Sequence, residues 1–171
     1  MINLEWAKSL FTRFSKPKFG QCIIHKTNRF YKIITDSKTK AGFLLGGDPV
    51  FLVEVDNVKE LENSIFESLL SSKSGVPVPS QEGYKIGEKD LCKKLGETSF
   101  TALYKGSNAL SVSFENNELK LIPLKYYNPL KASQGLVDVT EDAQLIADPF
   151  NNKEQVTSLV IQLLEKDYRL S

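Results

Sequence analysis

The single histidine of this chain, His25, is the residue best suited to acid–base chemistry, because an imidazole changes protonation state near neutral pH. It follows Cys22-Ile23-Ile24, an apolar run that predicts a strand. Catalysis by histidine requires an orienting acid and a nucleophile in contact with the ring, and a sequence alone shows neither. We therefore interpret His25 as a structural or surface residue, and a catalytic role stays open as the alternative.

Carboxylates form two groups along the chain. The first begins just before an amphipathic segment and continues along it, and the second lies in an irregular segment. They are Glu54, Asp56, Glu60, Glu62 and Glu67, and then Asp138, Glu141 and Asp142. Paired carboxylates can cut glycosides or hold Mg²⁺ when they converge in a cleft. The first group falls on the polar face of the amphipathic pattern, which favours a solvated surface over a docking surface. The second group is expected to be exposed, and we predict that Asp138, Glu141 and Asp142 contact a protein partner.

The cysteines and glycines do not match known metal or phosphate motifs. Cys22 and Cys92 lie far apart and have no Cys or His at zinc-ligand spacing, so two buried reduced thiols are expected. Gly46-Gly47 lacks the Lys-Ser/Thr that completes a phosphate-binding loop, and a sharp turn is the preferred interpretation. The sequence therefore predicts no catalytic residue, no metal and no cofactor, and a protein that is not an enzyme.

Composition is ordinary for a globular domain, but charge is unevenly distributed. The 171 residues are 41% hydrophobic and carry a net charge of +1. Residues 1–40 hold nine Lys or Arg against Glu5 and Asp36, so a basic quarter precedes a mildly acidic remainder. Aromatic residues interleave with these bases, which keeps a nucleic-acid-binding module open as an alternative. No signal peptide and no apolar run of about 20 residues is evident, so we expect a cytoplasmic protein without a membrane contact.

Apolar periodicity predicts short strands in hairpins, with helices between the groups of strands. Strands are predicted at 21–26, 30–35, 42–45, 50–55, 99–104, 109–114, 118–124, 134–139 and 145–146. Helices are predicted at 4–14 and at 88–95, the latter closed by Gly96, after Asp56 or Asn57 with Leu61, Ile65 and Leu69 in the buried stripe, and after Asn151 or Asn152. Residues 36–40 are expected to form a polar loop, and Asn116-Asn117 a turn. This order predicts one α/β (α+β) domain over residues 1–171, with a central mixed, largely antiparallel sheet and flanking helices.

Several short segments at turns and helix ends form a recognisable pattern. They read KAGFL at 40–44, DPVFL at 48–52, LLSSKSGVPVP at 69–79, LGETSF at 95–100, IP at 122–123 and QGL at 134–136, before a terminal amphipathic helix. With these segments in this order, the chain resembles the immunity proteins of bacterial contact-dependent growth inhibition. The resemblance covers roughly residues 20–166 and leaves the first twenty residues uncovered.

That resemblance implies a sheet decorated with helices and a function in binding. Such proteins bind the C-terminal toxin domain of a cognate effector in the cytosol, and the toxins are commonly nucleases. The family pattern transfers no functional residues. Nuclease inhibitors are often acidic, and the near-neutral charge of this chain leaves the toxin's activity open. We therefore expect a heterodimer with the toxin and a monomer or weak dimer without it. The alternatives are a nucleic-acid-binding module using the basic quarter and a small carboxylate-based enzyme.

Overall fold

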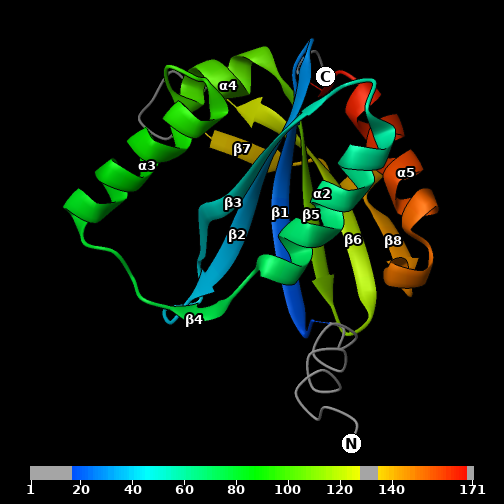
Figure 1. The fold of residues 1–171 in the computed structure, drawn as a ribbon, viewed down its shortest axis with the longest axis horizontal. Coiled ribbons are helices and arrows are strands. Elements are labelled where there is room, and N and C mark those ends of the chain that lie inside the picture. Colours follow the sequence, from blue (N-terminus) through cyan, green and yellow to red (C-terminus); the bar gives the residue numbers. More distant parts are fainter. Residues whose placement is uncertain (1–16, 128–134, 169–171) are drawn as a thin grey trace, which may run out of the picture.

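An eight-stranded sheet forms the centre of the protein in the computed structural model, which describes residues 17–127 and 135–168 (Figure 1). Six strands lie in the order β3-β2-β1-β5-β6-β7, while β4 pairs with β2 and β8 pairs with β6. The strands are β1 (Phe19–Lys26), β2 (Phe30–Thr39), β3 (Leu44–Glu54), β4 (Ser74–Val76), β5 (Asn108–Glu115), β6 (Glu118–Tyr127), β7 (Gly135–Asp138) and β8 (Gln144–Ala147). Only the β2–β4 pair is parallel among these pairings, so the predicted mixed, largely antiparallel sheet is confirmed.

Helices pack on the two faces of this sheet in two pairs. They are α2 (Val58–Ser71), α3 (Gln81–Leu95), α4 (Phe100–Gly106) and α5 (Lys153–Glu165), with short 3-10 turns η1 (Thr140–Asp142) and η2 (Pro149–Asn151). In the described part of the chain, no helix combines the length and apolar character needed to cross a membrane. The flanking helices and the single domain agree with the predicted fold class.

Alternation along the strands assigns each helix pair to its own face. Successive strand residues point to opposite faces, and Cys22, Ile24 and Ile33 join the core formed with α2 and α5. Ile34, which follows Ile33 in β2 and points to the other face, joins a second, smaller core with Leu91 of α3. The α2/α5 face therefore carries the main hydrophobic core, and the α3/α4 face carries less apolar packing.

The segment 99–104 was predicted as a strand, and this prediction is wrong. It forms most of α4, which begins after Ser99, whose hydroxyl accepts a hydrogen bond from the Ala102 amide at 3.1 Å. Phe100, Leu103 and Tyr104 are spaced three and four residues apart, which is a helical period. Helix α3 also begins at Gln81 rather than near residue 88, because Ser80 caps it through the Gly83 amide at 3.1 Å.

The predicted double-glycine reversal is also wrong. Residues 44–54 form one continuous strand, in which Gly46 and Gly47 pair with Asp36 and Thr35 of β2. The pairing then passes from Gly47 directly to Val50, so the intervening Asp48 and Pro49 form a bulge. The left-handed backbone that a turn needs occurs earlier, at Gly42, where φ is +90°.

Other local predictions are confirmed. Gly96 closes α3 in the left-handed conformation, and Asn116-Asn117 form the tight turn between β5 and β6 with positive φ at both residues. Asn57 caps α2 through the Glu60 amide. Both cysteines are free and buried. The helix predicted at 4–14 lies outside the described residues.

Candidate functional site: a cleft between α3 and the sheet

A cleft of about 390 Å³ lies between the sheet and the helices α3 and α4. It exists because the second core joins α3 to the sheet through Leu91 and Leu95, in the C-terminal half of the helix. The N-terminal half of α3 contributes Gly83 and Gly87, which have no side chains, to the cleft wall. The remaining lining residues are Ile23, His25, Ile34, Asp36, Leu44, Leu45, Gly46, Pro79, Tyr84, Glu88, Leu91, Phe100 and Tyr104.

Asp36 is the most unusual residue of this cleft. It is only 4% exposed, yet within the described residues its carboxyl makes no hydrogen bond and no ion pair. Gly46 lies opposite it in the strand pairing, and a methyl group at Gly46 would come 3.4 Å from Asp36 Oδ1. Burial raises the pKa of the Asp36 carboxyl to about 7. The carboxyl is therefore only partly ionised at neutral pH.

His25 is held in a structural arrangement. The ring is 1% exposed and stacks on Tyr104 at 5.7 Å between centroids. Its Nδ1 lies 3.0 Å from Ser107 Oγ, and the Ser107 hydroxyl donates to the Leu103 carbonyl at 2.6 Å. Since Ser107 has one proton to donate, His25 Nδ1 must be the donor in their pair. The Ser107 hydroxyl is therefore not arranged as a nucleophile activated by His25.

Burial, and then the nearby Lys32 charge, lower the pKa of His25 to about 3. The ring is therefore neutral at physiological pH and contributes no charge to the cleft. These contacts agree with the structural role that the sequence favoured for His25.

A buried ion pair fixes the end of α3 over the sheet. Lys32 of β2 is 6% exposed, and its ammonium donates to the Leu95 carbonyl and to Glu97 Oε1, both at 2.6 Å. The Lys32 side chain lies on the same face of the sheet as Asp36, the face covered by α3, because the two residues are an even number of positions apart in β2. Lys32 is thus held at the end of α3 and does not pair with the Asp36 carboxyl.

The entrance of the cleft is apolar. Leu44 is 42% exposed and Tyr84 is 36% exposed, and both line the cleft. The neighbouring Phe43 is also exposed, and its ring lies 6.4 Å from that of Tyr84. Large apolar side chains grouped at the mouth of a cleft are typical of a binding surface.

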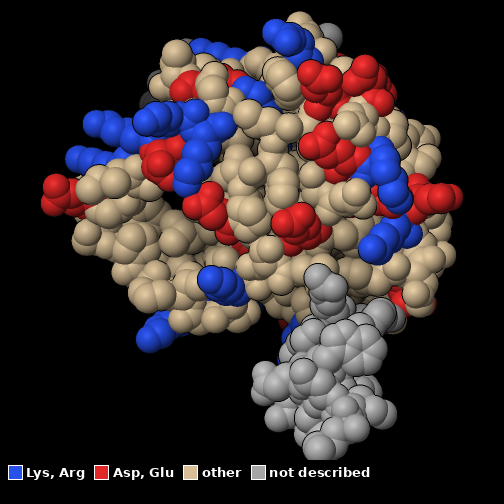
Figure 2. Space-filling view, viewed as in Figure 1, with Lys and Arg blue, Asp and Glu red and all other residues tan. Residues whose placement is uncertain are grey.

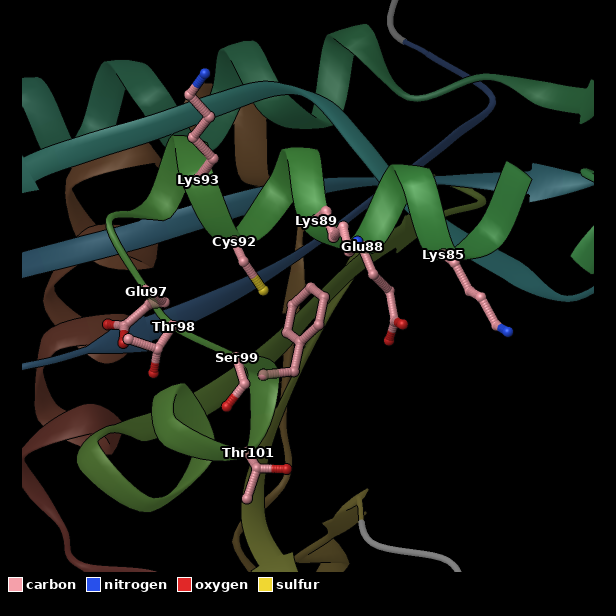
Figure 3. A pocket seen from close by; sticks show the side chains of 10 residues that line it. Lys85, Glu88, Lys89, Cys92, Lys93, Glu97, Thr98, Ser99 and Thr101 are labelled. Atoms are coloured by element: carbon pink, nitrogen blue, oxygen red, sulfur yellow. The ribbon is translucent and has the colours of Figure 1, made fainter. Parts of the chain in front are cut away.

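A second, outer groove of about 650 Å³ runs between α3 and the start of α4. Lysines from α3 line it, and Figure 2 shows basic side chains gathered over α3 and α4. Figure 3 shows Cys92 pointing from α3 toward the segment with Thr98 and Ser99, whereas Lys93 points away. Burial is the main cause that raises the pKa of the Cys92 thiol. The thiol is therefore protonated at neutral pH and is not an activated nucleophile.

The predicted partner-binding acids lie at the other end of the sheet. Asp138 is exposed at the end of edge strand β7, and Glu141 is exposed in η1. Asp142 accepts hydrogen bonds from the Tyr168 hydroxyl at 2.7 Å and from Lys166 Nζ at 3.1 Å. Asp142 therefore also holds the C-terminal residues Lys166 and Tyr168, whereas Asp138 and Glu141 are exposed. Their contact with a partner stays a prediction.

The other charged groups singled out in the sequence have separate locations. Glu62 is buried rather than solvated, and its carboxylate pairs with Lys59 at 2.6 Å. In the basic quarter, residues 1–16 lie outside the described part, and Lys32 is used in the buried pair described above.

The sequence interpretation missed Asp36, which it placed in a polar loop after a strand ending at residue 35. The strand instead continues to Thr39. The available signal was the two-residue period: Asp36 has the same parity as Ile34, so a longer strand would have placed it in the interior.

Comparisons with known proteins indicate the fold of this chain. The sequence matches no protein-family model and no curated protein. A protein of unknown function from Neisseria meningitidis has a similar structure, with a TM-score of 0.62 and 20% identity over 88% of this chain and 96% of that chain. A chain of a CdiA-CT/CdiI toxin and immunity complex from Yersinia pseudotuberculosis is also similar. Its TM-score is 0.59 and its identity 13%, over 87% of this chain and 97% of that chain.

Proposed function

We propose that this protein is an immunity protein of a contact-dependent growth inhibition system, which neutralises a toxin domain by binding it in the cytosol. The observation that carries the proposal is the structural similarity to a chain of the Yersinia toxin and immunity complex, which extends over 87% of this chain. The pattern of turns and helix ends in the sequence supports the same family by a separate route. The outcome of binding is a stoichiometric heterodimer in which the toxin's active surface is covered.

The cleft under α3 is the part of the surface that best fits such a role. It combines an exposed apolar entrance with a polar group at its base, as the centres of protein interfaces do. His25 and Cys92 are both held in unreactive states, so the described geometry supports binding rather than a chemical step. In this proposal, binding alone is enough to neutralise the toxin, because the bound protein covers the toxin's active surface.

The test is co-expression with the toxin domain of the effector that the proposal expects to be encoded next to this gene. Cells that express the toxin domain alone should stop growing, and cells that also express this protein should grow. The two purified proteins should elute together at a ratio of one to one. A toxin domain from an unrelated effector serves as the control and should not be neutralised. Failure of both rescue and co-elution with the adjacent toxin domain would overturn the proposal.

The raised pKa of Asp36 also favours a second candidate function, a carboxylate-based enzyme. A pair of acid and base groups would need another carboxyl that converges with Asp36. Glu88, the other carboxyl that lines the cleft, is exposed on α3. Titration of the toxin separates the candidates: an enzyme protects at far less than one molar equivalent, whereas a binding protein protects only as it approaches one equivalent.

A further inference from the structure

Among the described residues, no cation pairs with the carboxyl at the base of the cleft, although a buried acid normally has such a partner. Asp36 is 4% exposed, and no hydrogen bond or ion pair to it exists among residues 17–127 and 135–168. On the same face of β2, Lys32 already donates to Leu95 and Glu97, and the exposed Lys38, two residues beyond Asp36, forms no ion pair with it. Burying an acid without a partner opposes folding, and a buried carboxyl is normally paired or hydrogen-bonded. The structure thus retains a largely buried acid that is unpaired among the described residues and lines the cleft.

The walls of the cleft favour a cation that carries an apolar stem. Neither Lys nor Arg occurs among the described residues that line it, and the lining carboxyls are Asp36 at the base and Glu88 nearer to solvent. His25 is neutral and adds no positive charge. Leu44, Leu91 and Tyr84 supply apolar walls between the entrance and the base. A volume of about 390 Å³ falls in the range of about 300–1,000 Å³ that is common for ligand clefts.

Gly46 provides the space in front of the carboxyl. Any side chain there would meet Ile34 Cγ2 at 3.1 Å and Asp36 Oδ1 at 3.4 Å. The glycine therefore leaves one side of Asp36 uncovered within the cleft. The sequence analysis instead explained Gly46 by a sharp turn, which the structure does not have at this position.

We infer that the cleft under α3 receives a lysine or arginine side chain of the toxin domain. The cation pairs with Asp36, and its aliphatic stem packs against Leu44, Leu91 and Tyr84. Long basic side chains bury their stems on apolar surface in this way. This inference rests on the proposed function and adds the chemistry of the residue that the toxin must present. The paired charges are desolvated together, so the contact contributes specificity as well as affinity.

The first experiment measures toxin binding to Asp36→Asn, which keeps the shape of the side chain and removes its charge. Affinity should fall by at least about 30-fold, because one partner of a buried charge pair is lost. Glu67→Gln removes an exposed carboxylate from α2, on the opposite face, and is the matched control. Its affinity should stay within about twofold of the unmodified protein. A thermal melt of each variant confirms that it is folded.

The second experiment needs no toxin. The probe is n-butylguanidinium at pH 8, where Asp36 is mostly ionised, and the neutral n-butylurea is its isosteric control. Backbone amide NMR signals of Gly46, Gly83 and Gly87 report on the cleft, since all three line it. The cation should produce saturable shifts in the unmodified protein, n-butylurea should not, and Asp36→Asn should lose the response.

The outcomes separate the inference from the proposed function. Equal toxin affinity of the unmodified protein and Asp36→Asn overturns the inference and leaves the proposed function intact. Absence of toxin binding to the unmodified protein overturns the proposed function. In that case the probe alone decides: a preference for the cation that depends on Asp36 supports a cleft for basic side chains, and equal binding of the two probes overturns it.

Discussion

The two faces of the sheet differ in what they bury: one is packed with apolar side chains, and the other holds polar groups and a cleft. The face under α2 and α5 is filled by fully buried aliphatic and aromatic side chains, including Leu61, Ile65 and Val160. The face under α3 and α4 buries an ion pair, a neutral histidine and a carboxyl that is unpaired among the described residues, and it retains an open cleft. The difference teaches that one sheet can place most of its apolar packing on one face and leave polar groups, which weaken folding, around an open cleft on the other.

The largest expected effect compares one leucine from each face. Leu69 of α2 is 0% exposed and Leu91 of α3 is 8% exposed beside the cleft. Leu69→Ala should lower the free energy of unfolding by about 3–5 kcal/mol, and Leu91→Ala by about 2 kcal/mol, because solvent can already reach the second site. Urea unfolding of both variants measures the difference. Equal losses would show that the α3 face is packed as tightly as the α2 face.

Asp36→Asn should stabilise the protein at high pH. Because the pKa of Asp36 rises from 3.8 unfolded to about 7 folded, the folded state binds more protons between these values, and stability falls as pH rises through that window. The variant lacks this loss, so its advantage in unfolding free energy should grow by at most about 4 kcal/mol from pH 4 to pH 8.

His25 acts with the opposite sign, since its pKa is lowered to about 3 and stability is lost as pH falls below 6.5. That contribution is common to both proteins and cancels in their difference. Thermal melts across pH 4–8 are the measurement. A constant difference between the two proteins would mean that Asp36 is not an unpaired buried acid.

Two glycines on the α2 face, one in β1 and one in β3, test how closely α2 approaches each strand. A methyl group at Gly20 of β1 would lie 2.6 Å from the Leu69 carbonyl oxygen of α2, whereas one at Gly47 meets nothing within 4 Å. Gly20→Ala should cost about 1–3 kcal/mol of unfolding free energy through overpacking. Gly47→Ala should be neutral or stabilise by up to about 1 kcal/mol. Similar melting temperatures for the two variants would contradict this packing of α2 on β1.

The smallest effect on folding is expected at the edge of the sheet, where the acids predicted from the sequence lie. Neutralising Asp138, Glu141 and Asp142 should slow association with a basic toxin by roughly tenfold at low salt, because exposed charges steer the encounter. The effect should fade near physiological salt, where screening acts over about 8 Å. Stopped-flow kinetics at two salt concentrations measure it.

Asp138→Asn with Glu141→Gln is the control for that triple variant, because it keeps the contacts of Asp142 with Tyr168 and Lys166. Association rates that do not change at low salt would remove this surface from the proposed interface and strengthen the case for the α3 cleft.

Local signals in the sequence were enough to predict much of the fold. Alternating apolar residues predicted β1, β5 and β6, and the helical stripe of Leu61, Ile65 and Leu69 predicted α2, because these patterns are repeated within a few residues. Gly96 and Asn116-Asn117 marked a helix end and a turn, since few other residues adopt their backbone angles. The segment 99–104 failed because a short apolar run fits a strand or a helix equally well.

The sequence by itself determined the class of fold, the alternation that separates the two faces and the absence of an evident catalytic motif. Only the tertiary structure decided that Asp36 lies buried without a partner among the described residues, that Lys32 pairs with Glu97, and that Gly46 leaves space beside the carboxyl. The physical reason is the distance along the chain: these relations join β2 to residues 10 to 65 positions later. Such contacts are set by strand register and by the height of α3 above the sheet, and neither is encoded in a local pattern.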